Sequence, residues 1–126
     1  MNEIELKGRT KAFALRVLKL VDAMPDTRSS RILAAQLGRS GTSVAANYRA
    51  ACRSRSTAEM ISKFAVVEEE ADESGFWLEL AADHGVMPAA QLGTLLKEAS
   101  ELTPIMVASR KTLQARNRKS GIPNPK

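Results

Sequence analysis

A chain of 126 residues is the size of one domain, and its 44% share of apolar residues is enough for one hydrophobic core. With 26% charged and only 4% aromatic residues, the composition argues against a β-sandwich. The single cysteine, Cys52, excludes an intrachain disulfide, and no stretch approaches the roughly 18 apolar residues that cross a bilayer. The start of the chain does not resemble a signal peptide, so we expect a cytoplasmic protein with no membrane partner.

The net charge of +5 is unevenly distributed along the chain. Residues 1–67 carry 12 basic and 5 acidic side chains, residues 68–103 carry 1 and 9, and residues 104–126 carry 6 and none. This basic, acidic, basic order suits a nucleic-acid partner, and it equally suits salt bridges between neighbouring helices or subunits. Both interpretations stay open at this point.

The first predicted helix covers residues 8–24, where apolar side chains follow a 4-3-4 spacing from Phe13 to Met24. Pro25 ends it. A second helix is predicted to start near Ser29 or Ser30, because either serine can cap it.

Glycines interrupt the small-residue stretch of this second helix at Gly38 and Gly41. The apolar spacing stays in phase across them, which favours one continuous helix over a loop break. Each glycine costs roughly 1 kcal/mol of helix propensity relative to alanine. We expect the close approach of a neighbouring helix to compensate.

The third and fourth helices carry clear boundary signals. Ser56 and Glu59 read as a capping box that starts the third helix, and Gly85 reads as its left-handed cap. The fourth helix is predicted over residues 89–115, with Pro104 inside it. That proline removes one hydrogen bond and predicts a kink in the turn before it.

Four long amphipathic helices with short connections predict an all-α fold, an antiparallel up-down-up-down four-helix bundle. We assign the bundle to residues 1–116 and a basic, disordered tail to residues 117–126, where the apolar periodicity is lost.

Residue types for catalysis or metal binding are scarce. A di-iron site in a bundle needs Glu-x-x-His pairs, but His84 is the only histidine and Ala81 stands three residues before it. One histidine and one cysteine also exclude the usual zinc ligand sets. We expect no enzyme activity, no metal and no cofactor.

Polar side chains of the second and third helices are expected to point toward the bundle or its groove. A structural hydrogen-bonded network is the favoured interpretation, and a ligand pocket between the helices is the alternative. The set comprises Arg39, Ser40, Ser43, Asn47, Glu70 and Glu73.

Basic side chains form two candidate nucleic-acid-binding sets, since lysine and arginine track phosphates. We expect the two sets to lie at different places on one subunit. The first set, around the turn between the second and third helices, comprises Arg49, Arg53, Arg55 and Lys63; the second, near the C-terminus, comprises Arg110, Lys111, Arg116, Arg118 and Lys119.

The third helix is apolar on more than one side at Phe76, Trp77 and Leu80. An exposed aromatic cluster is typical of an interface. These residues are therefore predicted to lie at the contact between subunits of a homo-oligomer.

Residues 36–47, QLGRSGTSVAAN, resemble the Q-L-x-R-S-x-x-S-I-x-x-N signature of the four-helix-bundle proteins also called 23S rRNA intervening-sequence proteins. Residues 70–80 and 107–112 also look like that family, and the resemblance spans about residues 8–115. The chain departs from the family pattern at Arg49-Ala50, where Glu-Gly is usual, and at Pro104.

The resemblance implies an antiparallel bundle that assembles into a ring, commonly a pentamer, with no enzyme activity. The family is similar to the accessory protein of diversity-generating retroelements, a basic pentameric bundle that binds nucleic acid and a reverse transcriptase. Two functions are consistent with these observations. One is a non-catalytic, homo-oligomeric adaptor that binds RNA or DNA. The other is a protein–protein interaction scaffold, in which the acidic stretch neutralises basic patches of adjacent subunits.

Overall fold

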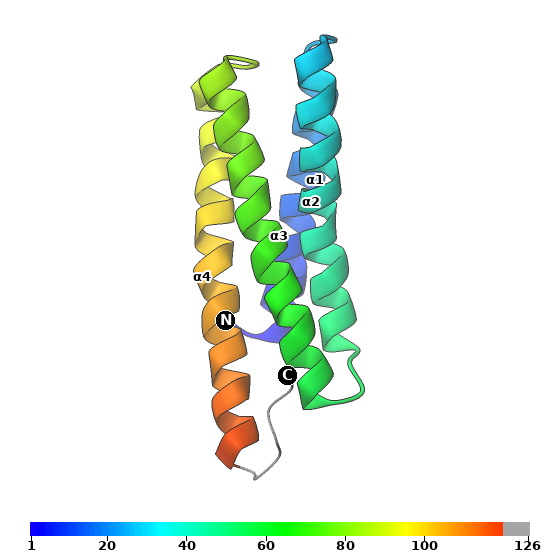
Figure 1. The fold of residues 1–126 in the computed structure, drawn as a ribbon, viewed down its shortest axis with the longest axis vertical. Helices are drawn as coiled ribbons and strands as arrows, with labels where there is room; N and C mark the ends of the chain where they lie inside the picture. The colour runs from blue at the N-terminus through cyan, green and yellow to red at the C-terminus, as the bar shows by residue number, and fades with distance from the viewer. Residues whose placement is uncertain (120–126) are drawn as a thin grey trace.

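The computed structural model describes residues 1–119 and contains four helices over that range (Figure 1). They are α1 (Glu3–Ala23), α2 (Arg28–Cys52), α3 (Thr57–His84) and α4 (Ala89–Lys119). Within these residues, no helix is both long enough and apolar enough to cross a membrane.

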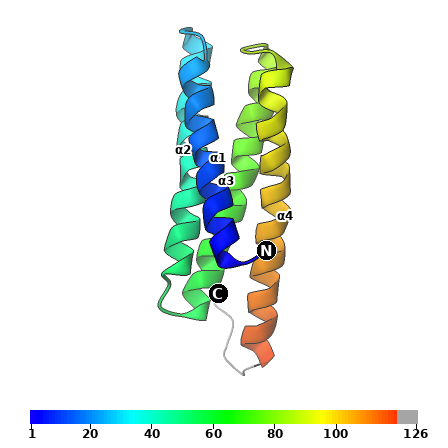
Figure 2. The same cartoon turned by 180° about the vertical axis from the view of Figure 1, so that it is seen from behind.

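Helices that follow one another in the chain pack side by side, so the predicted up-down-up-down bundle is confirmed. The α1–α2 and α3–α4 connections lie at one end of the bundle (Figures 1 and 2). The α2–α3 connection, the start of α1 and the end of α4 lie at the other, which we call the basic end.

Contact between α1 and α4 is much sparser than contact between consecutive helices. One ion-paired cluster crosses this seam. The guanidinium of Arg9 donates two hydrogen bonds of 2.8 Å to the carboxylate of Glu98 and one of 2.8 Å to Glu101. These charge-assisted bonds hold α1 to α4 where few apolar contacts do so.

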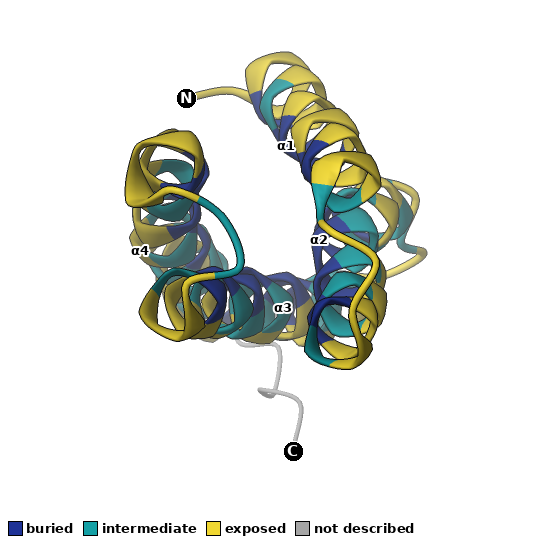
Figure 3. Cartoon of the chain, turned by 90° about the horizontal axis from the view of Figure 1, so that it is seen from above, coloured by how far each residue is buried: buried dark blue, intermediate teal, exposed yellow. Residues whose placement is uncertain are grey.

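The buried side of each helix faces the bundle axis (Figure 3). The predicted apolar stripes are confirmed at their central positions, among them Phe13, Leu37, Val67 and Leu102, which are fully buried. Burying each such side chain contributes roughly 1.5–3 kcal/mol. Leu18, an apolar residue of α1, is 44% exposed and lies outside the buried stripe.

Two helices begin earlier than predicted. The first starts at Glu3 rather than at Gly8, because the Asn2 side chain accepts a hydrogen bond of 2.8 Å from the Glu5 amide. The second is capped by Thr27, whose hydroxyl accepts from the Ser30 amide at 3.2 Å. Ser30 therefore lies in the first turn, and the prediction of a serine cap was wrong.

The start and end signals of α3 are confirmed in their main features. Ser56 Oγ accepts from the Glu59 amide at 3.1 Å, as the capping box requires. The Glu59 carboxylate accepts from the amide of Arg55, 3.4 Å away, rather than from Ser56. Gly85 has a φ of 77° and ends the helix in the left-handed conformation.

The helix α2 is continuous through both glycines, as predicted. The two glycines have different reasons to be there. A Cβ added at Gly41 would lie 2.8 Å from both methyl carbons of Val17, so the close approach of α1 requires this glycine. A Cβ at Gly38 would meet nothing within 4 Å, so packing does not explain it.

The last helix extends further than predicted. It runs through Pro104 and ends at Lys119, so the boundary that we set at residue 116 was three residues short. Residues 117–119 are helical and not part of a tail. The rest of the predicted disordered tail, residues 120–126, lies outside the described residues. The kink at Pro104 stays a prediction.

Candidate nucleic-acid interface

The two predicted basic sets lie at the same end of the bundle, which corrects our expectation that they are apart (Figures 1 and 2). Two chain reversals separate α2 from α4, so both helices run in the same direction. Their C-terminal ends therefore share the basic end, and they do so within one subunit.

A groove of about 380 Å³ lies between the first half of α1 and the last half of α2. Four of its lining residues are basic, two from α1 and two from the end of α2 and its cap, and we call it the basic groove. The complete lining is Lys7, Thr10, Lys11, Ala45, Ala46, Tyr48, Arg49 and Arg53.

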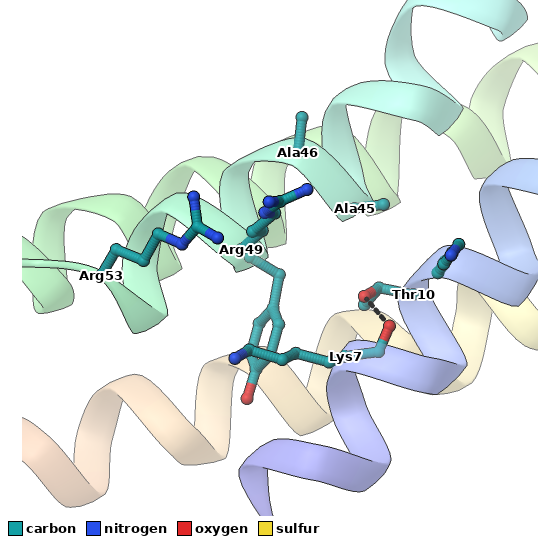
Figure 4. A pocket seen from close by; sticks show the side chains of 8 residues that line it. Lys7, Thr10, Ala45, Ala46, Arg49 and Arg53 are labelled. Carbon is teal, nitrogen blue, oxygen red and sulfur yellow. Dashed lines mark hydrogen bonds between the residues drawn. The ribbon is translucent and has the colours of Figure 1, made fainter.

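Figure 4 shows Lys7 on α1, and Arg49 and Arg53 on α2. The methyl groups of Ala45 and Ala46 lie about one turn before Arg49 on α2. The Thr10 hydroxyl donates within α1, to the carbonyl oxygen of Leu6 at 2.8 Å, so it is already satisfied.

The cations of the basic groove are little neutralised by the protein itself. Lys7 lies 3.6 Å from Glu3 in an exposed pair. Within residues 1–119, Lys11, Arg49 and Arg53 form no ion pair with an acidic side chain, and α2 contains no aspartate or glutamate. The groove therefore presents positive charge to solvent.

Sequence reasoning missed Lys7 and Lys11. Their four-residue spacing was the available signal, since it places both on one side of a helix. Which side faces α2 depends on the packing of α1 against α2, which includes the close approach of Val17 to Gly41. The sequence alone did not indicate that α1 supplies half of the basic groove.

Tyr48 lies beneath the basic groove and is only 3% exposed. Its ring stacks on Phe64, with centroids 5.8 Å apart. Burial raises the pKa of the Tyr48 hydroxyl above its usual range. This ring is part of the core and offers no face to a ligand.

The remaining predicted basic residues differ in their surroundings. Arg55, Lys111, Arg116, Arg118 and Lys119 are exposed, and Lys63 is half-buried. Arg110 lies 3.0 Å from the carboxylate of Glu68 on α3, with 22% of its side chain exposed. Because Glu68 neutralises it, Arg110 belongs with the structural ion pairs rather than with the free cations.

A second cavity, of about 520 Å³, opens between the start of α1 and the end of α4. Apolar side chains such as Leu6, Phe64 and Leu113 line it, and Cys52 and Arg116 lie at it too. Burial raises the pKa of the Cys52 thiol. A thiol that stays protonated is a poor nucleophile, and Cys52 packs against the hydrophobic core.

The predicted polar network divides into separate parts. Arg39 on α2 bridges to Glu70 at 3.1 Å and to Glu73 on α3. The Glu73 carboxylate also accepts a hydrogen bond of 3.3 Å from the Trp77 indole. The guanidinium of Arg39 lowers the pKa of Glu73.

Two further polar contacts involve hydroxyl groups. Ser40 Oγ lies 2.9 Å from Ser74 Oγ, deep between α2 and α3. Ser74 was not in the predicted polar set, so its role was missed. The amide of Asn47 donates to Ser43 Oγ at 2.7 Å, one turn away on the same helix, and so makes a local contact within α2.

The outer side of α3 is apolar and acidic. Phe76 is 54% exposed and Leu80 is 38% exposed, while Trp77 is half-buried. The Phe76 and Trp77 rings meet edge to face, with centroids 5.1 Å apart. This exposed apolar cluster was predicted as an oligomer interface.

The fold and the groove define a small helical-bundle protein with a concentrated basic surface. Within residues 1–119, no cluster of three or more histidine, cysteine, aspartate or glutamate side chains is arranged to hold a metal ion. The chain belongs to the 23S rRNA-intervening sequence protein family, whose model matches residues 2–108.

Among solved structures, the fold is similar to that of a protein of unknown function from the S23 ribosomal protein family of Bacteroides thetaiotaomicron. The TM-score is 0.79 and the sequence identity 27%, over 84% of this chain and 98% of that one. A comparison with curated proteins gave no match.

Proposed function

We propose that this protein is a non-catalytic, homo-oligomeric adaptor that binds RNA or DNA through phosphate contacts. The basic groove is the observation that carries this proposal. Four cations from two helices border one groove, and within residues 1–119 three of them have no acidic partner. Cations that the protein leaves unneutralised are available for an anionic polymer.

The exposed cations near the groove extend this surface. Arg55 follows α2, and Arg116, Arg118 and Lys119 end α4, all at the basic end. Each phosphate contact releases counterions, so affinity should fall steeply as salt rises.

Fluorescence anisotropy with labelled RNA and DNA at several salt concentrations tests the proposal. The Arg49→Ala/Arg53→Ala variant should bind roughly tenfold more weakly per lost contact near 0.1 M salt, and the slope of log K against log salt should fall by about 2. Arg39→Ala is the matched control, because it removes an arginine of α2 that Glu70 and Glu73 already neutralise. An equal loss in the control variant, or no binding at low salt, would contradict the proposal.

We also propose that the subunits meet through Phe76, Trp77 and Leu80. Two large apolar side chains exposed on adjacent turns of α3 support a subunit contact. The pentamer implied by the family resemblance is the assembly we propose.

The double variant Phe76→Ser/Leu80→Ser should dissociate this oligomer, as measured by light scattering after size exclusion. Ile4→Ser is the control, since Ile4 is 79% exposed on a different helix. A wild-type chain that is monomeric at micromolar concentration would overturn this assignment.

A protein–protein interaction scaffold is the alternative function. The exposed acidic residues of α3, such as Glu69, Asp72 and Glu79, support it, because they can neutralise the basic groove of an adjacent subunit. In that case Arg49→Ala/Arg53→Ala should weaken the oligomer, and neither the wild type nor the variant should bind nucleic acid.

We propose a cytoplasmic location for either function, in keeping with a single cysteine.

A further inference from the structure

We infer that the nucleic acid held by the basic groove is double-stranded. This inference rests on the proposed function and narrows it to one form of the polymer. It follows from where the aromatic side chains lie, from the arrangement of the four cations, and from the small side chains beside them.

Proteins that bind single strands combine a basic groove with aromatic side chains on which the bases stack, worth about 1–3 kcal/mol per base. The chain has five aromatic residues and one histidine. Three of the aromatic rings, Phe13, Tyr48 and Phe64, are buried in the core.

The other three rings lie away from the basic groove. Phe76 and Trp77 lie on α3. There the Trp77 indole donates a hydrogen bond to the Glu73 carboxylate, and the Glu79 side chain is exposed nearby. His84 ends α3 at the opposite end of the bundle from the α2–α3 connection. Within residues 1–119, the basic groove therefore has no exposed aromatic ring on which an unpaired base can stack, because Tyr48 in its lining is only 3% exposed.

The cations form two short rows on neighbouring helices. Lys7 and Lys11 are four residues apart on α1, and Arg49 and Arg53 are four residues apart along α2 and its cap. A four-residue step advances about 6 Å along a helix, and a duplex presents a phosphate about every 3.4 Å along each strand. Each row thus spans about two phosphates.

The two cation rows border the basic groove from its two sides, one from α1 and one from the end of α2. A duplex offers two phosphate rows at a fixed separation, whereas a single strand must fold to offer two. The methyl groups of Ala45 and Ala46 leave room for a sugar–phosphate backbone to approach.

Anisotropy of the full chain with four labelled 20-mers of mixed sequence, as single-stranded and double-stranded RNA and DNA, tests this inference. Both duplexes should bind at least tenfold more tightly than either single strand. With about four phosphate contacts, the slope of log K against log salt should be near −3.6 for duplex DNA. The two duplex arms separate a preference for A-form RNA from one for B-form DNA.

Lys7→Ala/Lys11→Ala locates the binding in the basic groove and should reduce the slope for duplex DNA by about 2. Arg16→Ala/Lys19→Ala is the matched control, because it removes the same charge from α1 outside the groove lining. Equal losses in the two variants would overturn the location.

Single strands that bind as tightly as duplexes would overturn this inference and leave the proposed function standing. No binding of any form at low salt would instead defeat the proposed function itself.

Discussion

Arginines on one helix, α2, meet two different surroundings. Arg39 faces the acidic helix α3 and is neutralised there by Glu70 and Glu73. Arg49, ten residues further on, borders the basic groove opposite α1 and has no acidic partner within the described part of the chain. The neighbouring helix, and not the residue type, decides whether an arginine contributes to the fold or is available to a ligand.

The same contrast holds between the two halves of the bundle. The acidic stretch of α3 is partly used within the subunit, by Arg39 from α2 and by Arg110 from α4. Within residues 1–119, α1 and α2 leave most of the cations of their shared groove unpaired. The basic, acidic, basic order of charges along the chain therefore separates into two groups in the fold. One group forms ion pairs within the subunit, and the other forms an exposed basic surface.

Breaking the α1–α2 contact should have the largest effect on stability. Gly41→Ala places a methyl group 2.8 Å from Val17, which is fully buried and cannot move aside. Overpacking of this kind costs up to about 3 kcal/mol, and alanine gains roughly 1 kcal/mol over glycine in a helix, so the net loss is up to about 2 kcal/mol. Urea unfolding at matched protein concentration measures the loss.

Gly38→Ala is the control for that change, because nothing lies within 4 Å of the added methyl group. It should raise the free energy of unfolding by up to about 1 kcal/mol. If both variants change the free energy of unfolding in the same direction, the close contact with Val17 is not the reason for a glycine at position 41.

Removing the ion-paired cluster between α1 and α4 should have the next largest effect. Arg9→Ala leaves the half-buried carboxylate of Glu98 without its partner, at a cost of about 1–2 kcal/mol. Hydrogen exchange should become faster along α1. Arg31→Ala, which breaks an exposed pair with Asp26, should cost less than about 0.5 kcal/mol. Unchanged exchange in the Arg9 variant would mean that apolar contacts alone hold the seam.

Lowering the pH should remove the stabilisation from the Arg9–Glu98 ion pair without any mutation. Arg9 lowers the pKa of Glu98, so the pair stabilises the fold above the usual glutamate pKa of about 4.3. That stability is lost as the pH falls through the lowered pKa of the folded state. The difference in free energy of unfolding between wild type and Arg9→Ala should therefore narrow between pH 5 and pH 3. If this difference in free energy of unfolding stays constant with pH, Arg9 stabilises the fold through packing of its aliphatic stem and not through its ion pair.

The smallest effect on stability is expected in the basic groove itself. Arg49→Ala and Arg53→Ala should each change the free energy of unfolding by less than about 0.5 kcal/mol, because both are exposed and form no ion pair with the part of the chain that the structure describes. Arg110→Ala, which breaks the half-buried pair with Glu68, should cost about 1 kcal/mol and leave nucleic-acid binding intact. If the Arg49 variant loses as much stability as the Arg110 variant, the groove cations are structural.

Local signals in the sequence predicted the helices well where one side chain acts on its own turn. The Ser56 cap and the left-handed Gly85 are such cases. Thr27 was missed as a cap because Thr27, Ser29 and Ser30 all suit that role, and the extended backbone at Thr27 decides among them. The early start of α1 depended on Asn2, beyond the apolar stripe that we used to place the helix.

The sequence by itself determined the four helices, their apolar faces and the order of their packing, because periodicity and capping act over a few residues. Only the tertiary structure decided which cations are free. Whether Arg110 meets Glu68, and whether Lys7 and Lys11 join Arg49, depends on the rotation of each helix about its axis. That rotation is set by contacts between residues far apart in the chain, such as Val17 with Gly41.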